Sequence, residues 1–231
     1  MASFCQRIAN ESPEPNTRTD ADNPRRARRV RGRFPRARPA HQLGCRANCR
    51  TLSRRLLITI LYHFTSPGHL RGIAIYGLTV GDVPTDLKRQ RGRIGVWLTS
   101  SESPGGHGLH GSGVDKTSYR LSVSVDEGSP SLHRWLDWVH GNVTTDTIDA
   151  LHKAAAQTEG DGPSTWFVYF GVLPPESIVD CVSVRTGESI KNWASITFPG
   201  MDIKPVPPWR REAWHRKMLK QVRSVLRRSN Q

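Results

Sequence analysis

The chain has 231 residues and a net charge of +14, with 36% hydrophobic and 7% aromatic residues. This apolar share is low for a globular protein and predicts that part of the chain does not fold. No apolar run is long enough to cross a membrane, no secretory signal is visible at the N-terminus, and four cysteines are too few for a disulfide scaffold. We therefore expect a soluble, cytoplasmic protein of a reducing compartment.

Charge divides the chain into three segments. Residues 1–55 hold 14 arginines, no lysine and four acids, a net charge of +10, whereas residues 56–200 carry −3 and residues 201–231 carry +7. An Arg/Pro-rich stretch of this kind buries too little apolar surface to fold, so we expect residues 1–55 to be disordered. One interpretation is that they form an arm that binds a polyanion. The interpretation we favour is that they are translated from GC-rich DNA upstream of the true start. Their His41, Cys45 and Cys49 lack a fourth ligand, and no metal site is predicted.

The middle segment shows alternating strand and helix patterns. Strands are predicted at 56–65, 94–99, 118–125, 166–170 and 178–184, helices at 69–76, 132–139, 145–157 and from 212 onward, and loops at 79–93 and 100–113. This order predicts an α+β domain over residues 56–200 with a small mixed sheet, followed by a basic C-terminal helix at 201–231. We expect His107 and His110, in the second loop, to be solvated.

The end of the first strand carries polar side chains in the stretch Tyr62-His63-Phe64-Thr65-Ser66. His63 and Thr65 share one face of the strand because side chains alternate with period two. A histidine there donates a hydrogen bond to a ligand hydroxyl, or it is a core histidine satisfied by a neighbour.

Two further clusters lie at strand ends. Val96-Trp97-Leu98-Thr99-Ser100 delivers two hydroxyls, Thr99 and Ser100, to the end of the second strand, where ligand clefts often form. Lys116 and Arg120 lie at the start of the third strand, where cations can hold a phosphate or carboxylate. The alternatives are a capped strand end for the first pair and a solvated turn for the second.

Together these motifs resemble the ADP-ribosyltransferase-like superfamily over residues 58–185, in particular its HYD1-type branch of small bacterial and phage proteins. The resemblance implies that NAD is the substrate and that His63 contacts its ribose. It also assigns Thr65 and Ser66 to the hydroxyls that come after it, and Thr99 with Ser100 to the hydroxyl position of the second strand.

The resemblance further implies a catalytic acid near the start of the strand at 166–170. Serine and threonine stand there, and the nearby candidates are Glu159, Asp161 and, less well placed, Glu176. We take Glu159 as the candidate, because a carboxylate is the main electrostatic stabiliser of an oxocarbenium-like transition state.

The residues support two functions from different classes. The first is an NAD-dependent mono-ADP-ribosyltransferase, a toxin or phage effector that modifies an unknown macromolecule, or a degenerate form of that fold kept for binding. The second is a non-catalytic protein that binds nucleic acid through its basic ends, with an affinity that falls steeply with salt. The two can coexist in one chain.

Overall fold

The computed structural model of the chain describes residues 57–109, 114–196, 198, 200 and 203–229, with side chains up to residue 221. Its strands are β1 (Ile58–Thr65), β2 (Asp82–Asp86), β3 (Arg91–Ile94), β4 (Val96–Thr99), β5 (Tyr119–Asp126), β6 (Leu132–Arg134), β7 (Trp166–Tyr169) and β8 (Ile178–Ser183). Its α-helices are α2 (Pro67–Tyr76), α3 (Trp135–Trp138), α4 (Thr145–Ala155) and α5 (Arg211–Ser229), and short 3₁₀ turns include η1 (Gly162–Thr165) and η4 (Pro208–Arg210). The segment predicted to be disordered, with its His41, Cys45 and Cys49, lies outside the described residues, as does His110.

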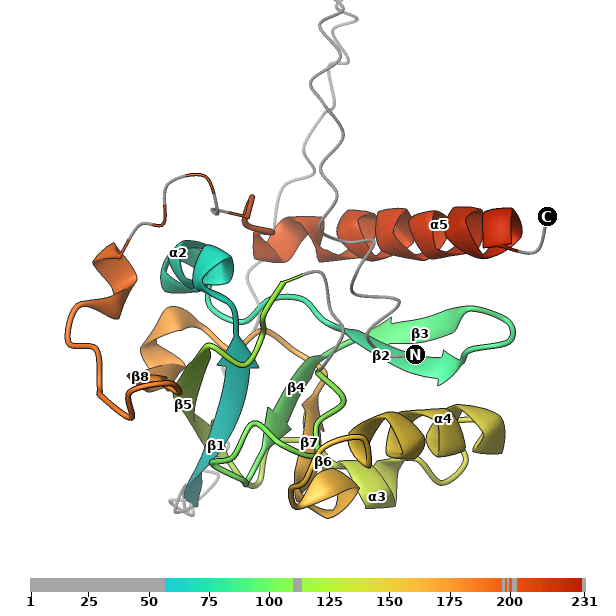
Figure 1. Cartoon of the computed structure of the whole chain (residues 1–231), viewed down its shortest axis with the longest axis horizontal. Helices are drawn as coiled ribbons and strands as arrows, with labels where there is room; N and C mark the ends of the chain where they lie inside the picture. The colour runs from blue at the N-terminus through green and yellow to red at the C-terminus, as the bar shows by residue number, and fades with distance from the viewer. Residues whose placement is uncertain (1–56, 110–113, 197, 199, 201–202, 230–231) are drawn as a thin grey trace, which may run out of the picture. The chain divides into compact units, whose positions relative to one another are not determined.

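Six strands form one sheet in the order β6-β7-β4-β1-β5-β8, and every neighbouring pair is antiparallel. The predicted α+β class is confirmed, and the predicted mixed sheet is wrong. A parallel pair would need a crossover connection between its strands. Instead, the β2–β3 hairpin turns the chain before it enters the sheet again, so that β4 runs against β1 (Figure 1).

The strongly patterned elements lie where the sequence predicts them. β1, β4, β5, β7 and β8 match the five predicted strands to within two residues at each end. The predicted helix at 69–76 begins two residues earlier, with Pro67 in its first turn, a position that needs no backbone donor. Gly77 ends this helix with φ 74°, and its N–H donates to the carbonyl of Ile73. Glycine adopts a positive φ at little cost and is common just after a helix.

Three local predictions are wrong. The predicted loop at 79–93 contains β2 and β3, because Val83 is buried by tertiary contacts that a polar sequence does not reveal. The predicted helix at 132–139 is the short strand β6 followed by the single turn α3, since Leu132 pairs with β7 across from Tyr169. The helix predicted at 145–157 ends two residues earlier, because α4 stops at Ala155.

The sheet has two covered faces, each with its own core. On the face that we call the α2 face, Leu61 of β1 and Leu121 of β5 pack in one cluster with Leu70 of α2. On the opposite face, the α4 face, Val168 of β7 packs in a second cluster with Trp135 of α3, as well as with α4. Successive residues of β1 therefore point into different surroundings.

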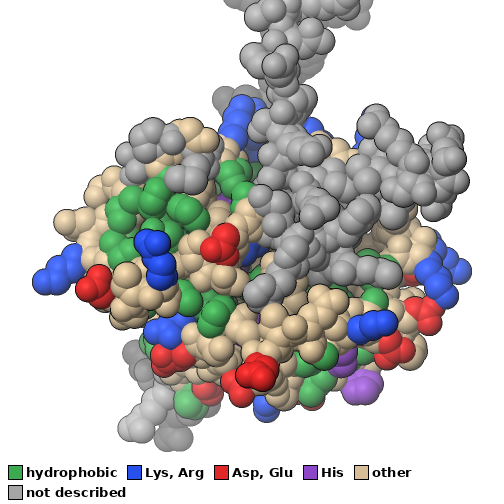
Figure 2. All heavy atoms as spheres, in the orientation of Figure 1, with side chains coloured by type: hydrophobic (Ala, Val, Ile, Leu, Met, Phe, Trp, Pro, Cys, Tyr) green, Lys and Arg blue, Asp and Glu red, His purple; other side chains and the backbone are tan. Residues whose placement is uncertain are grey.

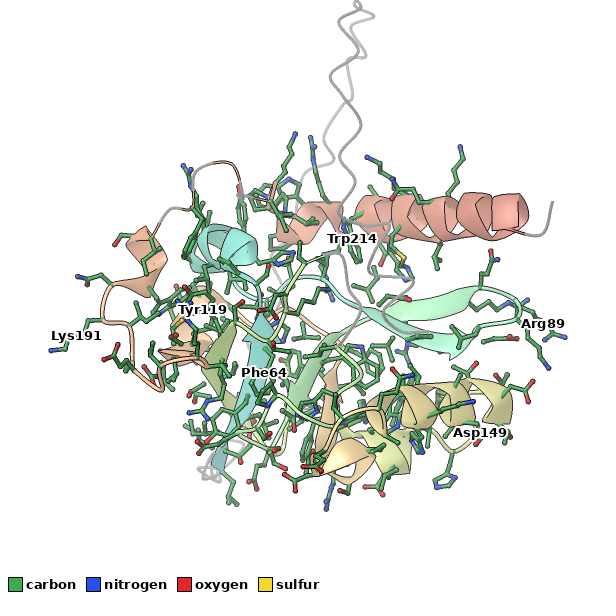
Figure 3. All side chains as sticks on the ribbon, viewed as in Figure 1. Phe64, Arg89, Tyr119, Asp149, Lys191 and Trp214 are labelled. Atoms are coloured by element: carbon green, nitrogen blue, oxygen red, sulfur yellow. The ribbon has the colours of Figure 1, made fainter. Side chains whose placement is uncertain are left out.

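The basic C-terminal helix predicted from the sequence is α5, which docks beside the β2–β3 hairpin (Figure 1). Met218 is buried in this contact, and Nε2 of His215 lies 2.9 Å from Oδ1 of Asp82. Trp214 lies on the side of the helix that faces the rest of the domain (Figure 3). Within the described residues, no helix combines the length and apolar character needed to cross a membrane.

Candidate functional site

The candidate site begins with His63, near the end of β1 on the α2 face. β1 pairs with β4 only at Tyr62 and Thr99, and no further pair continues this ladder toward the end of β1. His63 bridges the opening, because its Nδ1 lies 2.9 Å from the carbonyl oxygen of Trp97. A carbonyl only accepts, so Nδ1 carries the proton and Nε2 is an acceptor. Burial lowers the pKa of His63 to about 4, and the ring is neutral at pH 7.

Ser66 and His69 continue the polar lining beyond the end of β1. Thr65 and Ser66 are both buried, and Oγ of Ser66 lies 2.7 Å from Nδ1 of His69. Burial lowers the pKa of His69 to about 3, so this second imidazole is also neutral at pH 7. Because its hydroxyl is used by His69, Ser66 does not cap the backbone of α2. The predicted residues His63, Thr65 and Ser66 are therefore brought together at one place.

Lys116 supplies the positive charge of this place. It lies three residues before β5, whose first residue, Tyr119, pairs with Thr65. Its charge lowers the pKa of both His63 and His69, in addition to the larger effect of burial. Burial lowers the pKa of Lys116 to about 8, and it has no hydrogen-bond or ion-pair partner among the described residues. A half-buried cation that has no counter-ion among the described residues is suited to bind an anion.

The hydroxyl of Thr99 points to the other side of the sheet. Thr99 pairs with Tyr62, so it shares the α4 face with Tyr62 while His63 lies on the α2 face. Its Oγ1 donates to Oγ1 of Thr165 at 3.0 Å and accepts from the backbone N–H of Ser101 at 3.0 Å. Ser100 is exposed at the surface beside it. The structure thus does not bring Thr99 and Ser100 together with His63.

Arg120 also lies on the α4 face, where it belongs to a closed network. Its Nη1 lies 2.7 Å from Oε2 of Glu102, and its guanidinium stacks over the ring of Tyr62 at 4.9 Å. The hydroxyl of Tyr62 donates to Oε1 of Glu102 at 2.8 Å. Glu102 was not predicted as a functional residue, and its only signal was that it is the single acid of the loop at 100–113. Because Glu102 already neutralises Arg120, Lys116 and Arg120 have different surroundings.

The three candidate acids lie outside the His63 cluster. Glu159, Asp161 and Glu176 are all exposed, and the charge that shifts the pKa of His63 is that of Lys116 rather than a carboxylate. Asp161 acts instead on His107, whose pKa it raises against the larger effect of burial. The described residues contain no group of three or more His, Cys, Asp or Glu side chains arranged to hold a metal ion.

His107 is a structural residue rather than the solvated one predicted. Nε1–H of Trp166 donates to its Nδ1 at 2.9 Å, and its Nε2–H donates to the carbonyl of Ser103 at 2.9 Å. The ring also stacks on Phe64 of β1, with centroids 5.5 Å apart; Phe64 is labelled in Figure 3. These contacts fasten the loop after β4 to the α4 face.

No family model matches the chain, and no curated protein or solved structure matches it either. A function for the chain is therefore inferred from its own motifs and geometry.

Proposed function

We propose that the chain is a mono-ADP-ribosyltransferase-like protein that binds NAD at the end of β1. The observation that carries the proposal is the cluster of His63, bonded to the carbonyl of Trp97, and His69, bonded to Ser66, near an ammonium, that of Lys116, which has no ion pair among the described residues. The motifs around His63 support the choice of NAD among anionic ligands. The opening of the β1–β4 ladder at His63 also supports it, since backbone groups there are not used by a neighbouring strand.

The protonation states determine the binding chemistry. Lys116 would hold an oxygen of the pyrophosphate, and a charge-assisted contact in a desolvated place is stronger than one at the surface. Nε2 of His63 would accept a hydrogen bond from a ribose hydroxyl, because Nδ1 is committed to the carbonyl of Trp97. A neutral imidazole suits a hydroxyl and leaves the single positive charge to the phosphates.

The transfer step requires, besides binding, a group that stabilises its transition state. The glycosidic C–N bond of NAD breaks, nicotinamide leaves with the electron pair as a neutral molecule, and an acceptor nucleophile bonds to the ribose carbon and loses its proton. A carboxylate near the ribose would stabilise the cationic transition state. Glu159 remains the proposed acid, although it lies outside the cluster, and the acceptor is a macromolecule of unknown identity. The geometry therefore supports binding more strongly than transfer.

Calorimetry of the full chain with NAD and with ADP-ribose tests the binding step. We expect saturable binding to the wild type and an affinity at least about tenfold lower for Lys116→Met, because a hydrogen bond to a charged group is lost. Lys153→Met is the matched control, since Lys153 is an exposed lysine of α4 and its replacement removes the same charge. Its affinity should equal that of the wild type.

Nicotinamide release separates binding from transfer. Glu159→Gln should retain NAD binding and lose release, whereas Glu176→Gln should retain both. The absence of NAD binding by folded wild-type protein would overturn the proposal, as would equal affinities for Lys116→Met and Lys153→Met. Binding without any release by the wild type would remove the transferase activity and leave an NAD-binding module.

A further inference from the structure

A large aromatic side chain, Trp209, is exposed just before α5. Its exposed fraction is 75%, the highest among the exposed large hydrophobic side chains of the described residues. The ring contacts Tyr76 by an edge-on approach, with centroids 5.8 Å apart. Because most of its surface is exposed, the indole is accessible to another aromatic ring, and every nucleobase has a flat face that can stack on it.

Basic side chains come after Trp209 along the outer side of α5. Arg216, Lys217 and Lys220 are exposed, at helical spacing, and we call these three residues the basic stripe. Met218 and His215 are buried on the side that contacts the domain. In Figure 3, side chains with nitrogen at their ends project from α5 away from the sheet. The stretch from Trp209 to Lys220 is about 16 Å long at helical rise.

The positive charge of this surface is not neutralised within the described part of the chain. The basic stripe forms no ion pair there, and the single acid between residues 203 and 221 is Glu212. Nε of Arg211, at the start of α5, is buried and has no hydrogen-bond partner among the described residues, and burial lowers the pKa of this residue. By contrast, some cations elsewhere form ion pairs, among them Lys88 with Asp146 and Arg120 with Glu102. The surface of α5 therefore favours a polyanion.

We propose that Trp209 and the basic stripe bind single-stranded nucleic acid, with phosphates along the stripe and an unpaired base stacked on the indole. Phosphate contacts need only positive charge, and stacking needs a base whose face is free, which a duplex does not offer except at its ends. An anionic membrane is less suitable, because an amphipathic helix inserts through its apolar side. In α5 the buried Met218 of that side already packs against the domain.

The test measures binding of the full chain to oligo(dT) and oligo(U) over a range of salt concentrations. Replacing the basic stripe by glutamine (Arg216→Gln, Lys217→Gln, Lys220→Gln) should reduce the slope of log affinity against log salt by about 2, since each phosphate contact contributes about 0.7 for a single strand. Trp209→Ala should lower the affinity by about 5- to 100-fold without changing the slope. Trp209→Tyr keeps an aromatic face and should retain most of the affinity.

The matched control removes three exposed cations elsewhere (Lys153→Gln, Arg185→Gln, Lys191→Gln). Lys191 points outward at the opposite end of the view from the hairpin tip (Figure 3). The arginines of residues 1–55 contribute equally in every variant, so the comparison isolates α5. Equal slopes for the stripe and control variants would overturn the proposal, as would an unchanged affinity of Trp209→Ala, a preference for duplex, or binding to anionic vesicles without binding to either oligonucleotide. Lys116→Met should bind oligonucleotides like the wild type, which separates this surface from the proposed NAD site.

Discussion

The two faces of β1 differ in whether the cation on each face has a counter-ion among the described residues. On the α2 face, Lys116 lies beside His63 and His69, and no counter-ion is present among the described residues. On the α4 face, Arg120 is bound by Glu102. On the visible side of the molecule, acidic and basic side chains are interspersed over the surface (Figure 2).

The difference lies in what surrounds each cation. Arg120 keeps an exposed carboxylate as the partner of its Nη1, although its buried Nε has no hydrogen-bond partner among the described residues. Lys116 is half-buried and gains no counter-ion among the described residues, a situation that costs stability and is relieved by an anion. An anionic ligand would therefore stabilise the α2 face more than the α4 face. Substitutions and changes of pH test this difference between the two cations. Their expected effects on stability and on pKa differ in size.

The largest effect concerns pH. The pKa of His63 is lowered to about 4 and that of His69 to about 3 by burial, whereas both titrate near 6.5 in the unfolded chain. Between these values the unfolded state binds more protons, so the free energy of unfolding falls as pH is lowered from about 6.5 to about 4. The slope is at most about 1.4 kcal/mol per pH unit for each ring. Urea unfolding at several pH values measures it.

The double variant His63→Gln, His69→Gln should show a smaller slope over the same range. Some slope should persist, because burial also lowers the pKa of His107 and His152. His140→Gln, which removes an exposed histidine, is the control. If the double variant and the control have the same slope, the two rings are not buried in the folded protein.

The next effect distinguishes the two cations directly. Lys116→Met should raise the free energy of unfolding by roughly 1–3 kcal/mol at pH 7, because it removes a desolvated charge. The gain should shrink as pH rises from about 8 to 10.5, where the folded wild type has lost the proton and the unfolded chain still holds it. Arg120→Met should instead lower stability, since it removes the contacts with Glu102 and Tyr62. The same sign for both variants would contradict the contrast between the faces.

Local patterns were enough to predict part of the fold and of the site. The apolar runs of β1 and β7 could be predicted as strands, because consecutive β-branched and aromatic residues favour strands in most sequence contexts. β2 was missed because its stability comes from Val83 under tertiary contacts. The polar cluster of His63, Thr65 and Ser66 was predictable because these residues lie close together in the chain.

The placement of Thr99 and His63 on opposite faces of the sheet could not be predicted from the sequence. It depends on the pairing of Tyr62 with Thr99, and a shift of one residue in that register would put both side chains on one face. The different states of Lys116 and Arg120 depend likewise on Glu102, a loop residue 18 positions away from Arg120. Register and loop placement are set by the packing of the whole domain rather than by the local sequence.

The smallest effect tests the closed network of the α4 face. The hydrogen bond to Glu102 raises the pKa of Tyr62, and burial adds to the rise, while the nearby charge of Arg120 opposes it. Glu102→Gln removes the negative charge and leaves Arg120 over the ring, so the pKa of Tyr62 should fall. An ultraviolet titration measures it, with Tyr62→Phe identifying the signal among the four tyrosines. Glu127→Gln, which removes an exposed acid beyond the end of β5, is the control.

An unchanged titration in Glu102→Gln would mean that the carboxylate does not neutralise Arg120 in solution. Both faces of β1 would then offer an unpaired cation, and Arg120 would become a second candidate for holding phosphate. A fall in the pKa of Tyr62 would instead leave Lys116 as the cation that a ligand can reach without displacing an internal partner. The sign of this small shift therefore decides which face of the strand a search for bound nucleotide should address.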